Sequence, residues 1–141
     1  MSRSVSRSAV VAAPPAEVFG LLADPRRHVE IDGSGTVKGM VKGPDRLSLG
    51  DRFGMRMRLG VPYVISSEVV ELEPDRRIAW RHVGHHVWRY ELEPVDGGTR
   101  VTETFDWATA RSPLALELLG IPARNARSID KTLDRLVARF A

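Results

Sequence analysis

The segment from residue 78 to residue 107, IAWRHVGHHVWRYELEPVDGGTRVTETFDW, constrains the fold more than any other part of the chain. Large apolar and polar side chains alternate along it, and turn sequences interrupt it at Gly84 and at residues 96–98 (Asp-Gly-Gly). An alternation of this kind, divided by glycine turns, predicts three antiparallel strands joined by two hairpins.

The two turns predict the register of these strands. The first places Trp80 opposite Trp88, and the second places Tyr90 opposite Glu103, if each hairpin is symmetric about its turn. Both registers put the same side chains on one face, and a slip of one residue would move every ring into solvent. That face holds Ile78, Trp80, His82, His86, Trp88, Tyr90, Val101, Glu103, Phe105 and Trp107.

A second strand pattern precedes this segment. From residue 51 to residue 59, Phe53, Met55 and Met57 share one face and arginines share the other, which predicts a sheet with one dry and one wet face. The facing of residues 63–72 is open, because Glu68 and Glu71 fall on opposite faces unless a bulge intervenes. Other predicted elements are a strand at 3–12, short helices from Pro15 and at 25–31, and a strand at 36–41.

The C-terminal residues predict the cover of the aromatic face. Ser112 and Pro113 suit the cap and first position of a helix, and Gly120 with Pro122 predicts a break. The remainder has a helical period, with arginines and aspartates largely on the opposite side. Its apolar stripe consists of Ala126, Ile129, Leu133, Val137 and Phe140.

Composition excludes several classes of protein. With 141 residues, 43% of them hydrophobic and 28% charged, the chain fits one globular domain, residues 1–141. It has no cysteine, which excludes disulfides, thiolate catalysis and iron–sulfur clusters. Acidic and basic residues are interleaved, so a net charge of +3 indicates no nucleic-acid partner. Without a long apolar run, we expect a cytoplasmic monomer or homodimer with no stable membrane insertion and no cofactor.

Five stretches carry local motifs: APPAEVFGLLADPRRH (13–28), EIDGS (30–34), LSLGDRFGMRMR (47–58), EVVELEPDRRIAWR (68–81) and YELEPVDGGTRVTETFDW (90–107). Together with the order of the elements, they resemble the START-like (SRPBCC) superfamily of polyketide cyclases, dehydrases and lipid-transfer proteins. The resemblance covers nearly the whole chain. It implies an α+β helix-grip fold, in which a curved antiparallel sheet of six to seven strands wraps around a long C-terminal helix. It also implies a cavity between sheet and helix that takes lipids, sterols or polyketides.

The aromatic and methionine face supplies the candidate ligand-binding residues. Rings and methionines often fill an ordinary core, but methionine also suits an adaptable apolar pocket. The set expected to line the cavity is Phe53, Met55, Met57, Tyr63, Trp80, His82, His86, Trp88, Tyr90, Phe105, Trp107, Ile129 and Leu133.

Glu103 is the residue that a simple core would not contain. A charge on an aromatic face is costly unless it is paired or protonated, so Glu103 either lies at the sheet margin, pairs with an arginine, or is a buried acid with a raised pKa. In the last case it could act with Tyr90 or His82 in proton transfer. His85 faces away from His82 and His86, so we expect no metal site.

Three functional hypotheses follow. The first is a protein that binds or transports a hydrophobic or amphipathic small molecule, such as a lipid, sterol or polyketide. The second is a cofactor-independent cyclase, aromatase or dehydratase that uses Glu103 with Tyr90 or His82. The third is an interaction module resembling co-chaperones or toxins, which requires a filled core and an exposed apolar patch.

Overall fold

The computed structural model describes residues 2–141, apart from the side chains of Val41 and Leu59. The chain forms seven strands and four α-helices within these residues. In order they are β1 (Ser4–Val11), α1 (Pro15–Leu22), the 3-10 helix η1 (Pro25–Arg27), α2 (His28–Ile31), β2 (Val37–Lys42), β3 (Arg52–Leu59), β4 (Val61–Glu73), β5 (Arg77–His82), β6 (Val87–Val95), β7 (Gly98–Asp106), α3 (Pro113–Leu118) and α4 (Ile121–Arg139).

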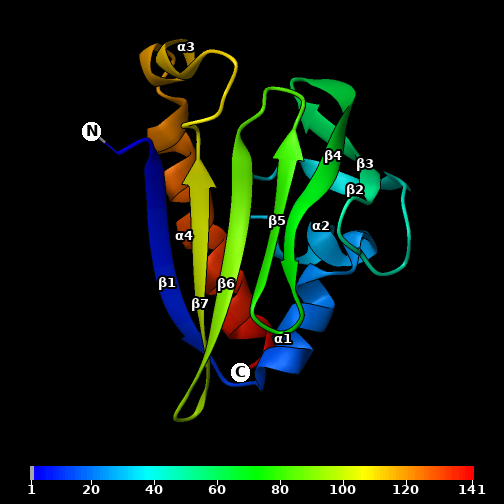
Figure 1. The fold of residues 1–141 in the computed structure, drawn as a ribbon, viewed down its shortest axis with the longest axis vertical. Helices are drawn as coiled ribbons and strands as arrows, with labels where there is room; N and C mark the ends of the chain where they lie inside the picture. The colour runs from blue at the N-terminus through cyan, green and yellow to red at the C-terminus, as the bar shows by residue number, and fades with distance from the viewer. Residues whose placement is uncertain (1) are drawn as a thin grey trace.

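All seven strands belong to one antiparallel sheet with the order β1-β7-β6-β5-β4-β3-β2. Figure 1 shows the helices on one face of this sheet, with α4 crossing behind β1 and β7 and with α1 and α2 farther along. The predicted α+β helix-grip fold is therefore confirmed, including the two short helical segments after the first strand. No helix within residues 2–141 is long and apolar enough to cross a bilayer.

Both predicted hairpin registers are confirmed. Trp80 lies opposite Trp88 in the β5–β6 pair, and Tyr90 lies opposite Glu103 in the β6–β7 pair. Phe105 lies opposite Trp88, so the rings of three strands share the face that the helices cover. This agreement follows from the pleat, because side chains two positions apart in a strand point the same way.

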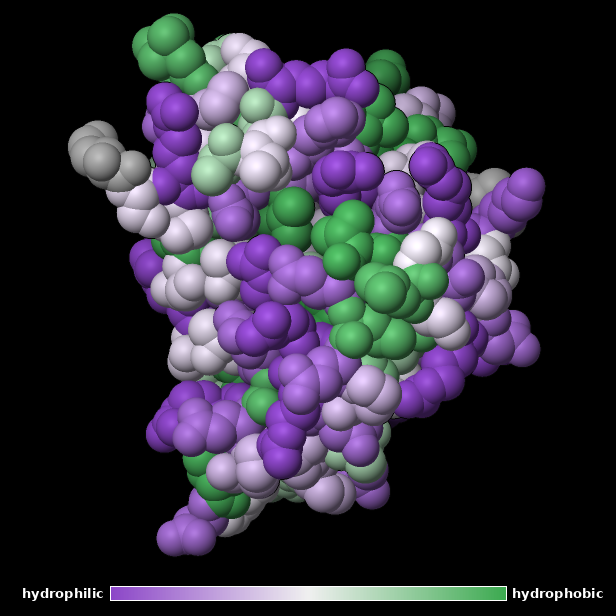
Figure 2. Space-filling view, viewed as in Figure 1, coloured by the Kyte–Doolittle hydropathy of each residue, from purple (hydrophilic) through white to green (hydrophobic). Residues whose placement is uncertain are grey.

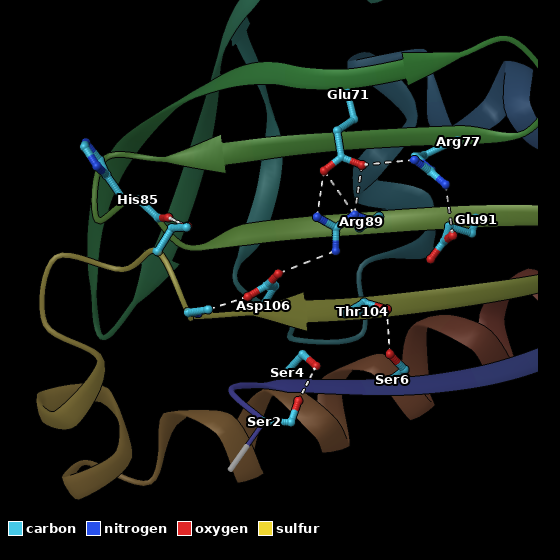
Figure 3. Close-up of polar contacts among 12 residues, drawn as sticks. Ser2, Ser4, Ser6, Glu71, Arg77, His85, Arg89, Glu91, Thr104 and Asp106 are labelled. Atoms are coloured by element: carbon cyan, nitrogen blue, oxygen red, sulfur yellow. Dashed lines mark hydrogen bonds and ion pairs between the residues drawn. The ribbon is translucent and has the colours of Figure 1, made fainter.

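The facing of β4 is settled by a bulge. The β4–β5 register shifts between Val69 and Glu71, which brings Glu71 onto the same outer face as Glu68. There the Arg81 guanidinium lies 3.3 Å from Glu68, and Arg89 donates three hydrogen bonds to the Glu71 carboxylate, at 2.6, 3.0 and 3.2 Å. Figure 3 shows Arg89 between Glu71 and Asp106, alongside the pairing of Arg77 with Glu91.

The buried stripe of α4 differs from the predicted one. Ile129 and Leu133 are buried as expected, but Val137 is 39% exposed, and Leu136 is fully buried in its place. Asn125 and Thr132 are also buried on this face. Relative to the predicted orientation, α4 is rotated so that a stripe containing polar side chains faces the sheet. The spacing of apolar residues alone cannot predict such a stripe.

The loop after α2 is fixed against α4 at Gly33. The Gly33 N–H donates a hydrogen bond of 2.8 Å to Thr132 Oγ1, and Arg135 Nη1 donates to the Asp32 carbonyl at 2.6 Å. A Cβ on Gly33 would lie 2.4 Å from the Ser128 carbonyl oxygen and 2.5 Å from the Thr132 nitrogen. Only a residue without a side chain permits this close approach of loop to helix.

We predict that Gly33→Ala lowers the free energy of unfolding by about 1–3 kcal/mol, because the new methyl group meets α4 backbone atoms that cannot move independently. Urea denaturation followed by circular dichroism measures the change. The matched control is Gly20→Ala in α1, where nothing lies within 4 Å of the added Cβ; this substitution should raise stability by about 0.5–1 kcal/mol. Equal stability of the wild type and Gly33→Ala would contradict the close packing.

Candidate functional site

A cavity of about 390 Å³ lies over the inner face of the sheet, beside α4. Strands β3 to β7 form one wall, and α2, its following loop and the first half of α4 form the other. It lies beside the helix and not beneath it, because α4 packs mainly on β1 and β7 and leaves the face of β3 to β6 less covered. The most exposed lining residues, Ser34, Tyr63 and Arg124, mark its mouth.

The structure brings most of the predicted ligand-binding residues to this cavity. Its lining includes Phe53, Met55, Met57, Tyr63, Trp80, His82, His86, Trp88 and Tyr90. The remaining four lie in the core beside the cavity and do not line it: Phe105, Trp107, Ile129 and Leu133. Phe105 lies in β7 and Trp107 directly follows it, and α4, which carries Ile129 and Leu133, packs over this strand.

Packed aromatic rings form part of the apolar wall. Trp80 packs against His28 with ring centroids 4.9 Å apart and planes 23° apart, and Phe53 meets Trp80 edge-on at 5.7 Å. His28 was not among the predicted site residues. Its buried Nε2 donates to the Leu22 carbonyl at 2.8 Å, and burial lowers its pKa, so the ring is a neutral part of the wall.

Glu103 lies inside the cavity wall, only 3% exposed and without an ion pair among the described residues. Its Oε1 has no hydrogen-bond partner in residues 2–141. Loss of hydration raises the pKa of the Glu103 carboxyl to about 8, and Asp32 adds to the rise, while a hydrogen bond from Tyr90 opposes it. Burial likewise raises the pKa of the Tyr90 hydroxyl. At neutral pH this pair is therefore predominantly uncharged.

The cavity histidines are also uncharged. The rings of His82 and His86 lie 5.0 Å apart, and the Nδ1 of His82 lies 2.7 Å from Ser67 Oγ. Burial, with a smaller contribution from His86, lowers the pKa of His82 to about 3. His85 is elsewhere, with its Nε2 3.2 Å from Arg111 Nη2. Within the described part of the chain, no three histidine or acidic side chains converge as a metal site.

Sequence reasoning missed the polar residues that α4 contributes. Arg124, Asn125, Ser128 and Thr132 all line the cavity. A signal for two of them existed, because Asn125 and Thr132 are seven residues apart and therefore share the helical face of Ile129. Arg124 is one of the arginines that the helical period of α4 places largely on the solvent side, where the charge of an arginine normally lies.

Comparisons with known proteins agree with this fold. The sequence profile described as "Polyketide cyclase / dehydrase and lipid transport" matches residues 2–141. The uncharacterized protein Rv0088 of Mycobacterium tuberculosis strain H37Rv is 46% identical over 143 residues, covering 97% of this chain. The chain spans 64% of the length of that relative.

Solved structures resemble the chain over nearly its whole length. The crystal structure of protein Ms6760 from Mycobacterium smegmatis has a TM-score of 0.71 at 20% identity, covering 98% of this chain and 93% of that chain. The solution structure of the Polyketide_cyc-like protein Cgl2372 from Corynebacterium glutamicum has a TM-score of 0.62 at 23% identity, covering 99% and 90%. At these identities the likeness shows the fold.

We predict a characteristic pH dependence of stability from Glu103. The unfolded carboxyl releases its proton near pH 4.3, roughly, whereas the folded one holds it to about pH 8. Its contribution to stability is therefore fully present below the unfolded pKa and is lost as pH rises through the folded pKa. Glu103→Gln removes this loss, so the variant should gain stability relative to the wild type between pH 5 and pH 9, measured by urea denaturation.

Glu71→Gln provides a control of opposite sign. Its hydrogen bond from Arg89 lowers the pKa of Glu71, so the wild-type carboxylate stabilises above the unfolded pKa and loses this effect as pH falls. Glu71→Gln should be less stable than the wild type at pH 7 and approach it in acid. If the stability difference between Glu103→Gln and the wild type does not change from pH 5 to pH 9, the carboxyl is not held protonated.

Proposed function

The chain belongs to the family of polyketide cyclases, dehydrases and lipid-transport proteins, and we propose that it binds a hydrophobic or amphipathic small molecule in the cavity beside α4. The cavity carries this proposal, since its volume of about 390 Å³ falls within the range of small-molecule sites, roughly 300–1,000 Å³. Rings, methionines and aliphatic side chains together form the larger part of its wall, and polar side chains, several of them from α4 and the loop after α2, form the rest.

The chemistry of the wall supports an apolar ligand body. Trp80, Trp88 and Phe53 offer large flat surfaces, while Met55 and Met57 can adapt to an irregular shape. Because Glu103, His82 and His28 are neutral at pH 7, an apolar group meets no full charge on these side chains. The third hypothesis, an interaction module with a filled core, receives less support because this space is not filled by side chains.

We predict that ligands of this class change the tryptophan fluorescence of the protein. Titration with fatty acids, sterols and aromatic polyketides should quench or shift the emission, because Trp80 and Trp88 line the cavity. Trp88→Phe should lose a large part of the response. Trp107→Phe is the matched control, since Trp107 is buried but does not line the cavity, and it should keep the response. No spectral change across the panel, together with no ligand adduct in native mass spectrometry, would count against binding.

A second candidate function is catalysis by Glu103. A buried carboxyl with a pKa of about 8 populates both protonation states near neutral pH, as proton transfer next to a carbonyl group requires. Tyr90 interacts with this carboxyl, and the unpartnered Oε1 is left for another group. This arrangement suits a cofactor-independent dehydratase or cyclase acting on a β-hydroxy carbonyl compound. The neutral His82 accepts the α-proton, the electrons of that C–H bond form the new C=C bond, and Glu103 gives its proton to the departing hydroxyl, which leaves as water.

For this candidate we predict that Glu103→Gln lowers the rate of dehydration of β-hydroxy ketones by about 100-fold or more while ligand binding persists. The conjugated product is followed by its ultraviolet absorbance. Activity should fall as pH rises through about 8, where Glu103 loses its proton. Full turnover by Glu103→Gln would leave binding as the function, and Glu71→Gln, on the outer face of the sheet, controls for a nonspecific loss of charge.

A further inference from the structure

The first turn of α4 lies at the cavity mouth and is electropositive. Ile121, Arg124 and Asn125 of this turn line the cavity. Gly120 precedes the helix in a left-handed conformation, with no side-chain cap, and the first turn contains no acidic residue. The N–H groups at such a helix start lack intrahelical partners and carry a partial positive charge.

We propose that this mouth, formed by Arg124, Asn125 and the start of α4, binds the carboxylate of an amphipathic ligand whose apolar body lies in the cavity. The inference rests on the proposed binding function and specifies its ligand class. It assigns the ligand an orientation, with the charged end toward solvent and the apolar end toward Trp80.

Arg124 is the cationic member of this subsite. It is exposed and lines the mouth. The ion pairs formed within residues 2–141 involve other arginines and leave Arg124 without a carboxylate partner. A guanidinium group can hold a carboxylate through two parallel hydrogen bonds, which fixes both the position and the orientation of the ligand.

Asn125 provides an independent observation. It is only 7% exposed, it lines the cavity, and its side chain makes no hydrogen bond to the described residues. Most buried side-chain amides in folded proteins are hydrogen-bonded. The Asn125 amide carries two donor hydrogens, so a ligand oxygen at the mouth would give it the partner that the protein does not supply.

Deeper groups favour the same orientation. Burial keeps Glu103 protonated and His82 neutral. Neither side chain therefore offers a positive charge to a ligand whose carboxylate enters the cavity first. Asp32 also lines the cavity, next to the mouth residue Ser34, and its carboxylate already accepts hydrogen bonds from the Ser34 hydroxyl and from the Ser34 and Val37 backbone N–H groups. An anion deep in the cavity finds no cation in Glu103 or His82, whereas at the mouth it meets Arg124.

Paired ligands that differ in one group test the subsite. Dodecanoate and 1-dodecanol are titrated at pH 7 while tryptophan fluorescence is recorded. The wild type should bind dodecanoate about tenfold more tightly, and Arg124→Gln should erase this preference with little change for dodecanol. Arg127→Gln is the matched control, because Arg127 is exposed on the same helix but does not line the cavity, and it should keep the preference.

The outcomes separate this inference from the function on which it rests. Equal wild-type affinities for the two ligands overturn the carboxylate subsite and leave the binding function standing. The same follows if Arg124→Gln weakens both ligands equally, which indicates a packing role. If neither ligand nor any member of the wider panel binds, the proposed function fails as well.

Discussion

The register of β5, β6 and β7 is the constraint on which the rest of the structure depends. A slip of one residue would turn Trp80 and Trp88 outward and bring Arg89 into the core. The outer face supports the same register, since Arg89 on β6 pairs with Glu71 on β4, across β5, and with Asp106 on the adjacent β7 (Figure 3). With the rings fixed on one side, α4 covers the β1–β7 half of that face, and the β3–β6 half becomes the wall of the cavity.

Much of the fold could be predicted because its strongest signals are local. Glycine turns at known positions set the registers, and the alternation in β3 set its inner face. The rotation of α4 could not be predicted from apolar residues, because part of its inward face faces a cavity and carries Asn125 and Thr132. The β4 bulge could be predicted only as one of two alternatives, because no particular residue type identifies the position of one extra residue in a strand.

The residues of the candidate site also fall into a group that could be predicted from local sequence patterns and a group that could not. Its wall could be predicted from strand alternation, whereas His28 and the α4 residues come from segments distant in sequence and needed the tertiary structure. Figure 2 shows the opposite, outer side of the sheet, where polar (purple) side chains surround a limited apolar (green) area. The contrast with the buried aromatic face explains why Glu103 stands out: acids are ordinary outside and rare within.

The pairing of β1 with β7 also bears on how the molecule is made. Ser4 pairs with Asp106, so the first strand finds its partner only after the remaining strands have been synthesised. Pairing between such distant segments is slow, because a long loop must close before any contact is gained. During that interval the aromatic face of the sheet is not yet covered by α4, which follows all seven strands in the sequence. The aromatic face stays exposed until α4 docks on β1 and β7, so aggregation of the folding chain is favoured during that interval.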